Sequence, residues 1–181
     1  MVMLRTIILA KNYKMKPARF IIGVVLFCSV LFAYESKAQQ QQPFVRVSGE
    51  VTAPLDFKVG DLQQMPQTQV LHKEKDGKEH TYAGVTLAEI LQKAGVTMGK
   101  DPKGKGLTRY VLIEAKDGYR VVFALTELDK DFTDRKIILA DKVDDKPLSE
   151  GTDPLQVIVE GEKKAGRCIK QVTAIKVAFA K

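Results

Sequence analysis

The chain has 181 residues, about the length of one average domain, and a formal net charge of +7. Six of its 29 lysines and arginines, but one of its 22 acidic residues, lie in the first 38 positions, so the remainder carries a net charge of +2. This near-balance excludes the strongly basic surface expected of a nucleic-acid-binding domain and gives no reason to expect an acidic membrane as a partner.

The first 38 residues have the order of a secretory signal peptide. Lysines and an arginine precede an apolar run over residues 20–33, which is shorter than the roughly 20 residues of a membrane-spanning helix. Ser36 and Ala38 supply small side chains at the −3 and −1 positions of a cleavage site before Gln39. Residues 1–14 precede Met15, which opens a signal peptide of ordinary length, so a misassigned start codon would explain them. We expect an exported, periplasmic protein, with an uncleaved membrane anchor as the alternative.

Cleavage would leave Cys168 as the only cysteine, so no intrachain disulfide is expected even in an oxidising compartment. The glutamine-rich residues 39–43 are interpreted as a linker, and one domain is expected over residues 44–181. Alternating apolar residues predict its first strand over 45–51, and a short helix is predicted over 59–65, stopped before a proline.

A hairpin is predicted over residues 69–83 because the pair Asp76 and Gly77 tolerates positive φ angles. The only histidines, His72 and His80, lie on its two strands. A two-residue turn at this pair would place their side chains on opposite faces of the hairpin. We therefore expect no metal site there, unless a β-bulge brings the two imidazoles together.

The clearest helix is predicted over residues 86–94, where Thr86 and Glu89 form a capping box and Gly95 ends the helix. Its apolar residues fall on one face, which predicts burial against a sheet. The lysine- and glycine-rich residues 98–106 match neither a P-loop nor a dinucleotide-binding fingerprint, so they are interpreted as a solvated loop.

The rest of the chain is predicted to be mainly strand. A second hairpin is expected over residues 110–125, followed by one helical turn, and three further strands are expected over 137–140, 155–160 and 172–179. Many strands, one clear helix and no alternation of strand and helix predict an α+β fold with a large mixed β-sheet and few helices.

Residues able to carry out catalysis are scarce. Cys168 has neighbouring cations, but nothing in the sequence identifies a histidine base for it, so a buried structural cysteine is the alternative. The acidic group Glu127, Asp129, Asp131 and Asp134 lacks the glycine and the closing glutamate of a calcium loop and is interpreted as a solvated loop. No catalytic residue and no metal ligand is therefore expected.

Several short segments share an order and a spacing that are moderately specific. They are residues 82–87, 90–91, 117–119, 138–140, 145–148, 151–155 and 157–159. Together they resemble the molybdopterin-binding domain of the sulfite-oxidase type, over about residues 45–177. The resemblance implies an α+β fold with a large mixed sheet, and a molybdenum held by two pterin sulfurs and one cysteine thiolate.

The chain departs from this family at two positions. The stretch that matches the family's cysteine, residues 70–74, contains no cysteine, and Gln156 stands where the family usually has an arginine. Tyr119 matches a tyrosine of the family's substrate pocket. Arg167 and Lys170 match a basic pair that holds the pterin phosphate in some members.

Two hypotheses follow from these matches and departures. The first is a cofactor-free binding or interaction module, whose partner is a small anionic ligand or a protein. The residues implied by the resemblance, Tyr119, Arg167 and Lys170, would then border one cleft and bind an anionic group. The alternative is a molybdopterin-dependent oxidoreductase that holds its cofactor without a thiolate.

Overall fold

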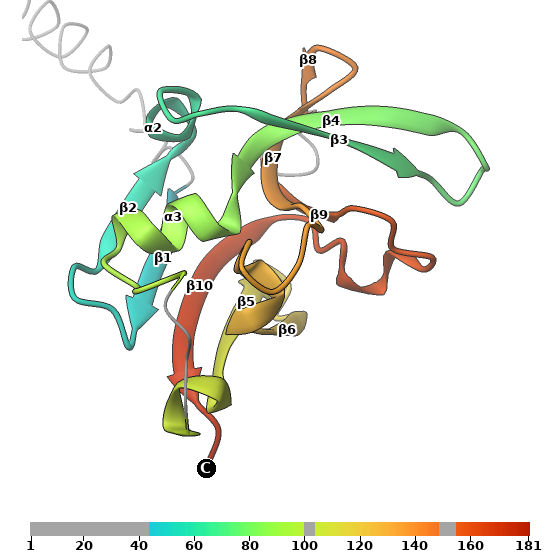
Figure 1. The fold of residues 1–181 in the computed structure, drawn as a ribbon. Coiled ribbons are helices and arrows are strands. Elements are labelled where there is room, and N and C mark those ends of the chain that lie inside the picture. The colour runs from blue at the N-terminus through green and yellow to red at the C-terminus, as the bar shows by residue number, and fades with distance from the viewer. Residues whose placement is uncertain (1–43, 100–103, 149–154) are drawn as a thin grey trace, which may run out of the picture. The chain divides into compact units, whose positions relative to one another are not determined.

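The computed structural model describes residues 44–99, 104–148 and 155–181. The expected signal peptide and the expected linker lie outside the described residues. Within them the chain forms two five-stranded sheets and few helices (Figure 1).

The first sheet has the strand order β2-β1-β10-β5-β6. The strands β1 and β10 run parallel, and every other neighbouring pair is antiparallel, so this sheet is mixed. Its strands are β1 (Phe44–Gly49), β2 (Leu55–Lys58), β5 (Arg109–Ala115), β6 (Arg120–Ala124) and β10 (Val172–Phe179).

The second sheet has the order β3-β4-β7-β8, with β9 also paired to β7, and all its pairs are antiparallel. Its strands are β3 (Thr68–Lys73), β4 (Glu79–Thr86), β7 (Ile137–Val143), β8 (Lys146–Pro147) and β9 (Gln156–Val159). Residues 137–141 of β7 and all of β9 are buried, which indicates that this part of the sheet is covered on both faces.

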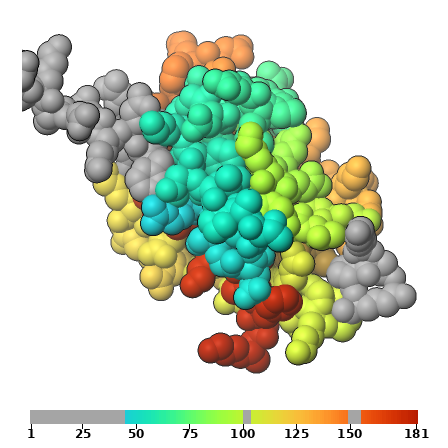
Figure 2. Space-filling view, turned by 90° about the vertical axis from the view of Figure 1, so that its left-hand side faces the viewer, coloured from blue at the N-terminus to red at the C-terminus, as the bar shows by residue number. Residues whose placement is uncertain are grey.

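Short helices complete the described fold. They are the α-helices α2 (Val59–Gln63) and α3 (Leu87–Lys93) and the 3-10 turns η1 (Gly104–Thr108), η2 (Leu125–Leu128) and η4 (Ala165–Arg167). Figure 2 shows the side of the domain on which the teal residues of β2 and α2 and the yellow-green residues of α3 form one continuous surface.

The expectation of a sheet-rich fold with few helices is confirmed, but the expected single large sheet is wrong. Gln156 of β9, in the second sheet, pairs with Lys170 in an isolated β-bridge, and Lys170 lies just before β10 of the first sheet. Gln171 follows this bridge with a φ of 56°, in the left-handed region. The chain therefore bends between the bridge and β10, so β10 continues in the first sheet.

One hydrophobic core joins the elements of both sheets. In β5 the buried residues alternate, as Val111, Ile113 and Ala115 do, while α3 buries Leu87 and the residues one turn further on. The first pattern has the two-residue period of a strand with one covered face. The second has the period of a helix that packs one side on a sheet.

The predicted capping box of α3 is present. The Glu89 backbone N–H donates to Thr86 Oγ1 at 3.2 Å, and the Thr86 backbone N–H donates to Glu89 Oε2 at 3.3 Å. Gly95 follows the helix with a φ of 79°, which favours glycine.

Loss of this cap is expected to weaken the fold. Thr86→Ala removes the acceptor for the Glu89 amide and should lower the free energy of unfolding by about 1 kcal/mol. In urea denaturation the midpoint should fall while the slope stays unchanged, because the surface exposed on unfolding is the same. An unchanged midpoint would contradict a helix start at Thr86.

Candidate functional site

Tyr119 ends the turn of the β5–β6 hairpin. Its backbone N–H donates to Asp117 Oδ1 at 2.9 Å, and Gly118 before it has a φ of 84°. The Tyr119 hydroxyl donates to the Gly166 carbonyl oxygen at 2.9 Å. The structure therefore brings this hairpin against the segment that carries Arg167, although 47 positions separate the two bonded residues.

Arg167 is held by three neighbours. Its Nη2 donates to Glu162 Oε2 at 2.7 Å, and its Nη1 donates to Glu127 Oε2 at 2.9 Å. The guanidinium carbon lies 4.9 Å from the centroid of the Phe123 ring, within the range of a cation–π contact. The hydrogen bonds to Glu162 and Glu127 raise the pKa of Arg167. Two carboxylates therefore neutralise the charge that was expected to attract an anion.

Lys170 and Cys168 lie just after this arginine. Lys170 is exposed, and among the described residues no ion pair of its ammonium is found.

Cys168 is buried, with 8% of its surface exposed, and this burial raises the pKa of its thiol. A thiol in this state is a poor nucleophile, so the structure favours the interpretation of Cys168 as a structural residue. Cys168 follows the turn η4, and Lys170 forms the isolated bridge with Gln156.

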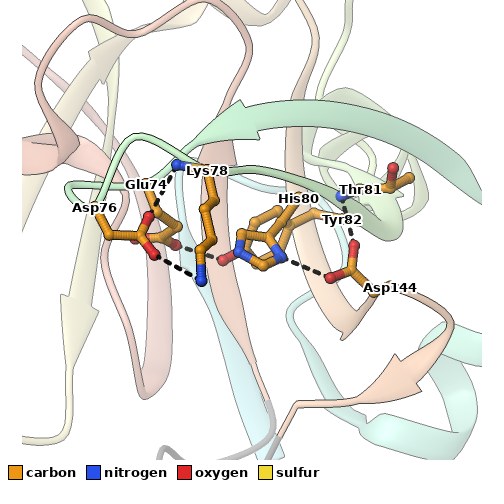
Figure 3. A network of polar contacts seen from close by, with 7 residues as sticks. All are labelled: Glu74, Asp76, Lys78, His80, Thr81, Tyr82 and Asp144. Atoms are coloured by element: carbon orange, nitrogen blue, oxygen red, sulfur yellow. Dashed lines mark hydrogen bonds and ion pairs between the residues drawn. The ribbon is translucent and has the colours of Figure 1, made fainter.

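A second polar cluster occupies the β3–β4 hairpin and the turn after β7 (Figure 3). Asp144 accepts from the Thr81 backbone N–H at 2.9 Å and lies 2.6 Å from His80 Nδ1. The Tyr82 hydroxyl donates to Glu74 Oε1 at 2.5 Å. Asp144 has a φ of 47°, in the left-handed region, which strains a non-glycine residue. Its contacts with His80 and Thr81 connect β4 to the turn that follows β7.

The expected register of the two histidines was wrong. His72 lies directly opposite His80, whereas a two-residue turn would have paired it with Thr81. The turn is longer than two residues, because the Glu74 N–H donates to the Lys78 carbonyl at 2.8 Å. The two histidines therefore share one face of the hairpin.

The new register does not by itself make a metal centre. His72 is 4% exposed, and its ring lies 6.2 Å from the Tyr82 ring in an edge-to-face arrangement. In the three described ranges, no group of three or more His, Cys, Asp or Glu side chains is arranged to hold a metal ion.

The His80–Asp144 pair is expected to give a pH-dependent contribution to stability. Its hydrogen bond raises the pKa of His80 above 6.5 and lowers that of Asp144 below 3.8. The histidine contribution is complete below pH 6.5 and is lost as the pH rises through the raised pKa. The aspartate contribution is present above pH 3.8 and is lost as the pH falls through the lowered pKa.

Asp144→Asn should therefore lower the urea midpoint most between these two pH values, and less at higher pH. Asparagine retains the acceptor for Thr81 and tolerates the positive φ, so the turn should survive. Asp145→Asn, in the same turn at a φ of 61°, is the matched control and should show no such maximum. The same loss at every pH would contradict the assignment to this ion pair.

A cavity lies elsewhere in the domain. It has a volume of about 730 Å³ and lies between α3 and the segment from Leu128 to Ile137. Asp129 is buried beside it and accepts the backbone N–H groups of Gly99 and Asp131. The sequence-predicted residues Tyr119, Arg167 and Lys170 do not line it.

The residues present do not suit the cofactor that the resemblance implies. In the stretch that matches the family's cysteine, His72 points into the core and no thiol is present. The arginine that matches the phosphate-binding pair already bonds two carboxylates, Glu127 and Glu162, which would repel a phosphate.

Sequence reasoning missed the two carboxylates that hold Arg167. Glu127 belongs to the acidic group that the sequence indicates as a solvated loop. Glu162 stands in a lysine-rich turn and is part of no motif that predicts an ion pair. Glu127 Oε1 accepts the Ala124 N–H at 3.0 Å at the start of η2, but Ala124 lacks the side-chain oxygen of a capping box, so the sequence carries no recognisable signal for it.

Comparison with known proteins identifies the scaffold. The sequence profile described as "Oxidoreductase molybdopterin binding domain" matches residues 34–180. The fold is similar to that of the sulfane dehydrogenase SoxCD from Paracoccus pantotrophus, with a TM-score of 0.56 and 21% sequence identity. The match covers 78% of this chain and 39% of the SoxCD chain, so this chain spans less than half of that protein. None of the curated proteins matches the chain.

In the described part of the chain, no helix is long and apolar enough to cross a membrane. The family profile extends over all ten strands, from β1 to β10, and the resemblance to the sulfite-oxidase type is thereby confirmed. The chain belongs to the family of oxidoreductase molybdopterin-binding domains.

Proposed function

We propose that this protein is an exported, cofactor-free binding module built on a molybdopterin-binding scaffold. The observation that carries the proposal is the bonding of Arg167 to both Glu127 and Glu162. An arginine that bonds two carboxylates has little positive charge to offer a phosphate, and the carboxylates repel the phosphate directly.

A protein partner fits the surroundings of Arg167 better than a small anion does. The Tyr119 hydroxyl already donates to Gly166, and the residue is 53% exposed. Exposed tyrosines contribute contact area and a polar tip at protein interfaces. Lys163, Lys164 and Lys170 are exposed in this segment, and solvated lysine charges contribute little to the recognition of a small anion.

Cofactor content tests the proposal directly. The protein should be purified from a molybdenum-sufficient host and examined by elemental analysis and pterin fluorescence. We expect no stoichiometric molybdenum and no pterin. Stoichiometric metal and pterin would overturn the proposal and favour the alternative, an oxidoreductase that holds the cofactor without a thiolate.

A variant without the two carboxylates tests whether neutralisation of Arg167 excludes a phosphate. In Glu127→Gln/Glu162→Gln, Arg167 is no longer neutralised, so binding of a pterin monophosphate at low salt should tighten at least about tenfold, or 1.4 kcal/mol. Adding Arg167→Ala should abolish this gain.

Glu114→Gln is the matched control. It removes the carboxylate partner of Arg120, on the β5–β6 hairpin away from the Arg167 bonds, and should leave pterin binding unchanged. Equal binding by the wild type and the Glu127→Gln/Glu162→Gln variant would show that the two carboxylates do not exclude the phosphate.

Export to the periplasm is part of the proposal and has its own test. The order of basic residues, apolar run and small residues before Gln39 supports cleavage at that position. The intact mass of the exported protein should correspond to a chain that begins at Gln39. A mass that retains residues 20–33 would favour the membrane anchor.

A further inference from the structure

The outer part of the β3–β4 hairpin has few connections to the rest of its sheet. The pairing of β4 with β7 ends at Tyr82, opposite Val143, and in the described ranges β3 pairs with β4 alone. Residues 71–81, the distal hairpin, therefore project past the last of these pairs (Figure 1). Apart from the contacts at Asp144, the two strands of the distal hairpin pair within the sheet with each other.

Asp144 fastens the distal hairpin at its base. The Asp144 backbone N–H donates to the Thr81 carbonyl at 2.8 Å, and Asp144 Oδ1 accepts the Thr81 N–H at 2.9 Å. The second carboxylate oxygen, Oδ2, lies 2.6 Å from His80 Nδ1 (Figure 3). One residue of the turn after β7 thus makes three polar contacts with the end of this segment.

The inner face of the hairpin covers the segment of Cys168. The second sheet curls so that β3, at one edge, contacts β9, which pairs with the other side of β7. His72 and Tyr82 on this face are 4% and 5% exposed. Burial raises the pKa of Tyr82 and the Cys168 thiol adds to this rise, while burial raises the pKa of Cys168 and Glu74 adds to that rise. The thiol therefore lies close to the hairpin.

We propose that the distal hairpin is a flap that opens as a unit over Cys168, and that the His80–Asp144 pair makes its closure depend on pH. Opening breaks the three contacts of Asp144 and leaves the pairing of β4 with β7 intact from Tyr82 to Thr86. It uncovers the thiol without unfolding the rest of the domain.

Little apolar surface holds the flap closed. His72 is buried, but its neighbours Leu71 and Lys73 are exposed, and so is the turn around Asp76. Segments that bury few apolar groups open locally at a much lower free-energy cost than the whole domain. The polar contacts at the base should therefore have a large share in keeping the flap closed.

Protonation of His80 favours the closed flap. The hydrogen bond to Asp144 raises the pKa of His80, so the closed flap binds the proton more tightly than the open flap does. Closure is therefore strongest below pH 6.5 and weakens as the pH rises through the raised pKa.

The surroundings of the pair support the same direction. The charged and titratable groups that face it are His72, Glu74, Asp76, Lys78, Tyr82 and Lys146. Asp76 and Glu74 add to the preference for a protonated His80, and Lys146 favours an ionised Asp144. The inference is independent of whether a pterin is bound, so its test and the test of the proposed function can fail separately.

Thiol labelling measures the opening. In a Cys28→Ala background Cys168 is the only thiol, and its burial makes its reaction with dithiodipyridine require exposure. Val111→Cys in a Cys28→Ala/Cys168→Ala background reports global unfolding, since Val111 is completely buried in the first sheet. Cys168 should react at least about tenfold faster, and its rate should depend less on urea, because local opening exposes less surface. Equal rates with equal urea dependence would overturn the proposal.

The pH dependence of labelling tests the fastening. Below pH 6.5, Asp144→Asn should speed the reaction of Cys168 about threefold relative to the unchanged background, the size expected of one partly exposed ion pair. The ratio should fall toward one at higher pH, where His80 is neutral in both proteins. Comparison at one pH cancels the titration of the thiol itself. A ratio that stays the same at every pH would overturn the proposal.

Two further variants separate the ion pair from the turn. His80→Gln retains a donor for Asp144 but cannot be protonated, so it should speed labelling below pH 6.5 and lose this effect at higher pH. Asp145→Asn, in the same turn, is the matched control and should label like the background at every pH. Circular dichroism confirms that the variants fold. Equal, pH-dependent acceleration by Asp145→Asn and Asp144→Asn would assign the effect to the turn and overturn the role of the pair.

Discussion

Replacement of Gly84 by alanine is expected to lower the free energy of unfolding by about 3 kcal/mol. A Cβ atom on Gly84 would lie within 3 Å of the Leu139 carbonyl and of the Ala140 Cα, both backbone atoms of β7. Backbone in the middle of a buried strand cannot move aside as a flexible side chain can. The pairing of β4 with β7 must therefore open to admit the methyl group.

The urea midpoint of Gly84→Ala measures this effect. Gly60→Ala in α2 is the matched control, because a Cβ at Gly60 meets nothing within 4 Å. That substitution should leave stability unchanged or raise it by up to about 1 kcal/mol, as alanine favours helices. Equal midpoints for the two variants would contradict the close approach of β4 and β7.

Gly84 also gives a physical reason for part of the family resemblance. The register shifts between Ala83 and Gly84, and a Cβ at Gly84 would meet the backbone of β7. A glycine at this position allows β4 to pair with β7 and to continue directly into the cap of α3. Residues 82–87 thus combine a close strand contact with the start of a helix.

Local signals in the sequence predicted most of the elements. Alternation of apolar residues located β1, β5, β6 and β10, which bury one face, and continuous apolar runs located β7 and β9, which are buried on both faces. The capping box located α3, because Thr86 and Glu89 satisfy each other's backbone N–H groups. The short elements β2, β8 and η4 were missed, since two to four residues carry no measurable period.

The register of the β3–β4 hairpin was mispredicted because turn length was inferred from two residues. Asp76 and Gly77 do form the turn, and Gly77 has a φ of 84°, but the Glu74 N–H to Lys78 carbonyl bond closes a longer loop. The shift of one residue in register moves His72 to the face of His80. The division into two sheets was missed for a similar reason, as it depends on the bend at Gln171.

The candidate site was predictable only in part. The resemblance implied that Tyr119, Arg167 and Lys170 border one cleft. The hydrogen bond from the Tyr119 hydroxyl to Gly166 brings the hairpin to the Arg167 segment, while the binding role of the three residues stays a prediction. The neutralisation of Arg167 was not predictable, because Glu127 lies 40 positions away and no local pattern links them. An ion pair of this kind depends on tertiary structure, so it appears only when the fold is known.

Phe123 is the residue that connects the core to Arg167. It is completely buried, and the guanidinium of Arg167 lies over its ring at 4.9 Å. Phe123→Ala should lower the free energy of unfolding by about 3–5 kcal/mol, because it removes a buried ring and leaves a cavity. Phe123→Leu should cost less, about 1.5 kcal/mol, since it retains most of the buried apolar volume.

A double-mutant cycle separates packing from the cation–π contact. Arg167→Met keeps an apolar stem over residue 123 and removes the charge. If the guanidinium binds the ring, Phe123→Leu and Arg167→Met together should differ from the sum of the single effects by about 0.5–1 kcal/mol. Urea denaturation of the four proteins measures this difference. A coupling of zero would mean that Glu162 and Glu127 alone position Arg167 and that the ring beneath it only fills the core.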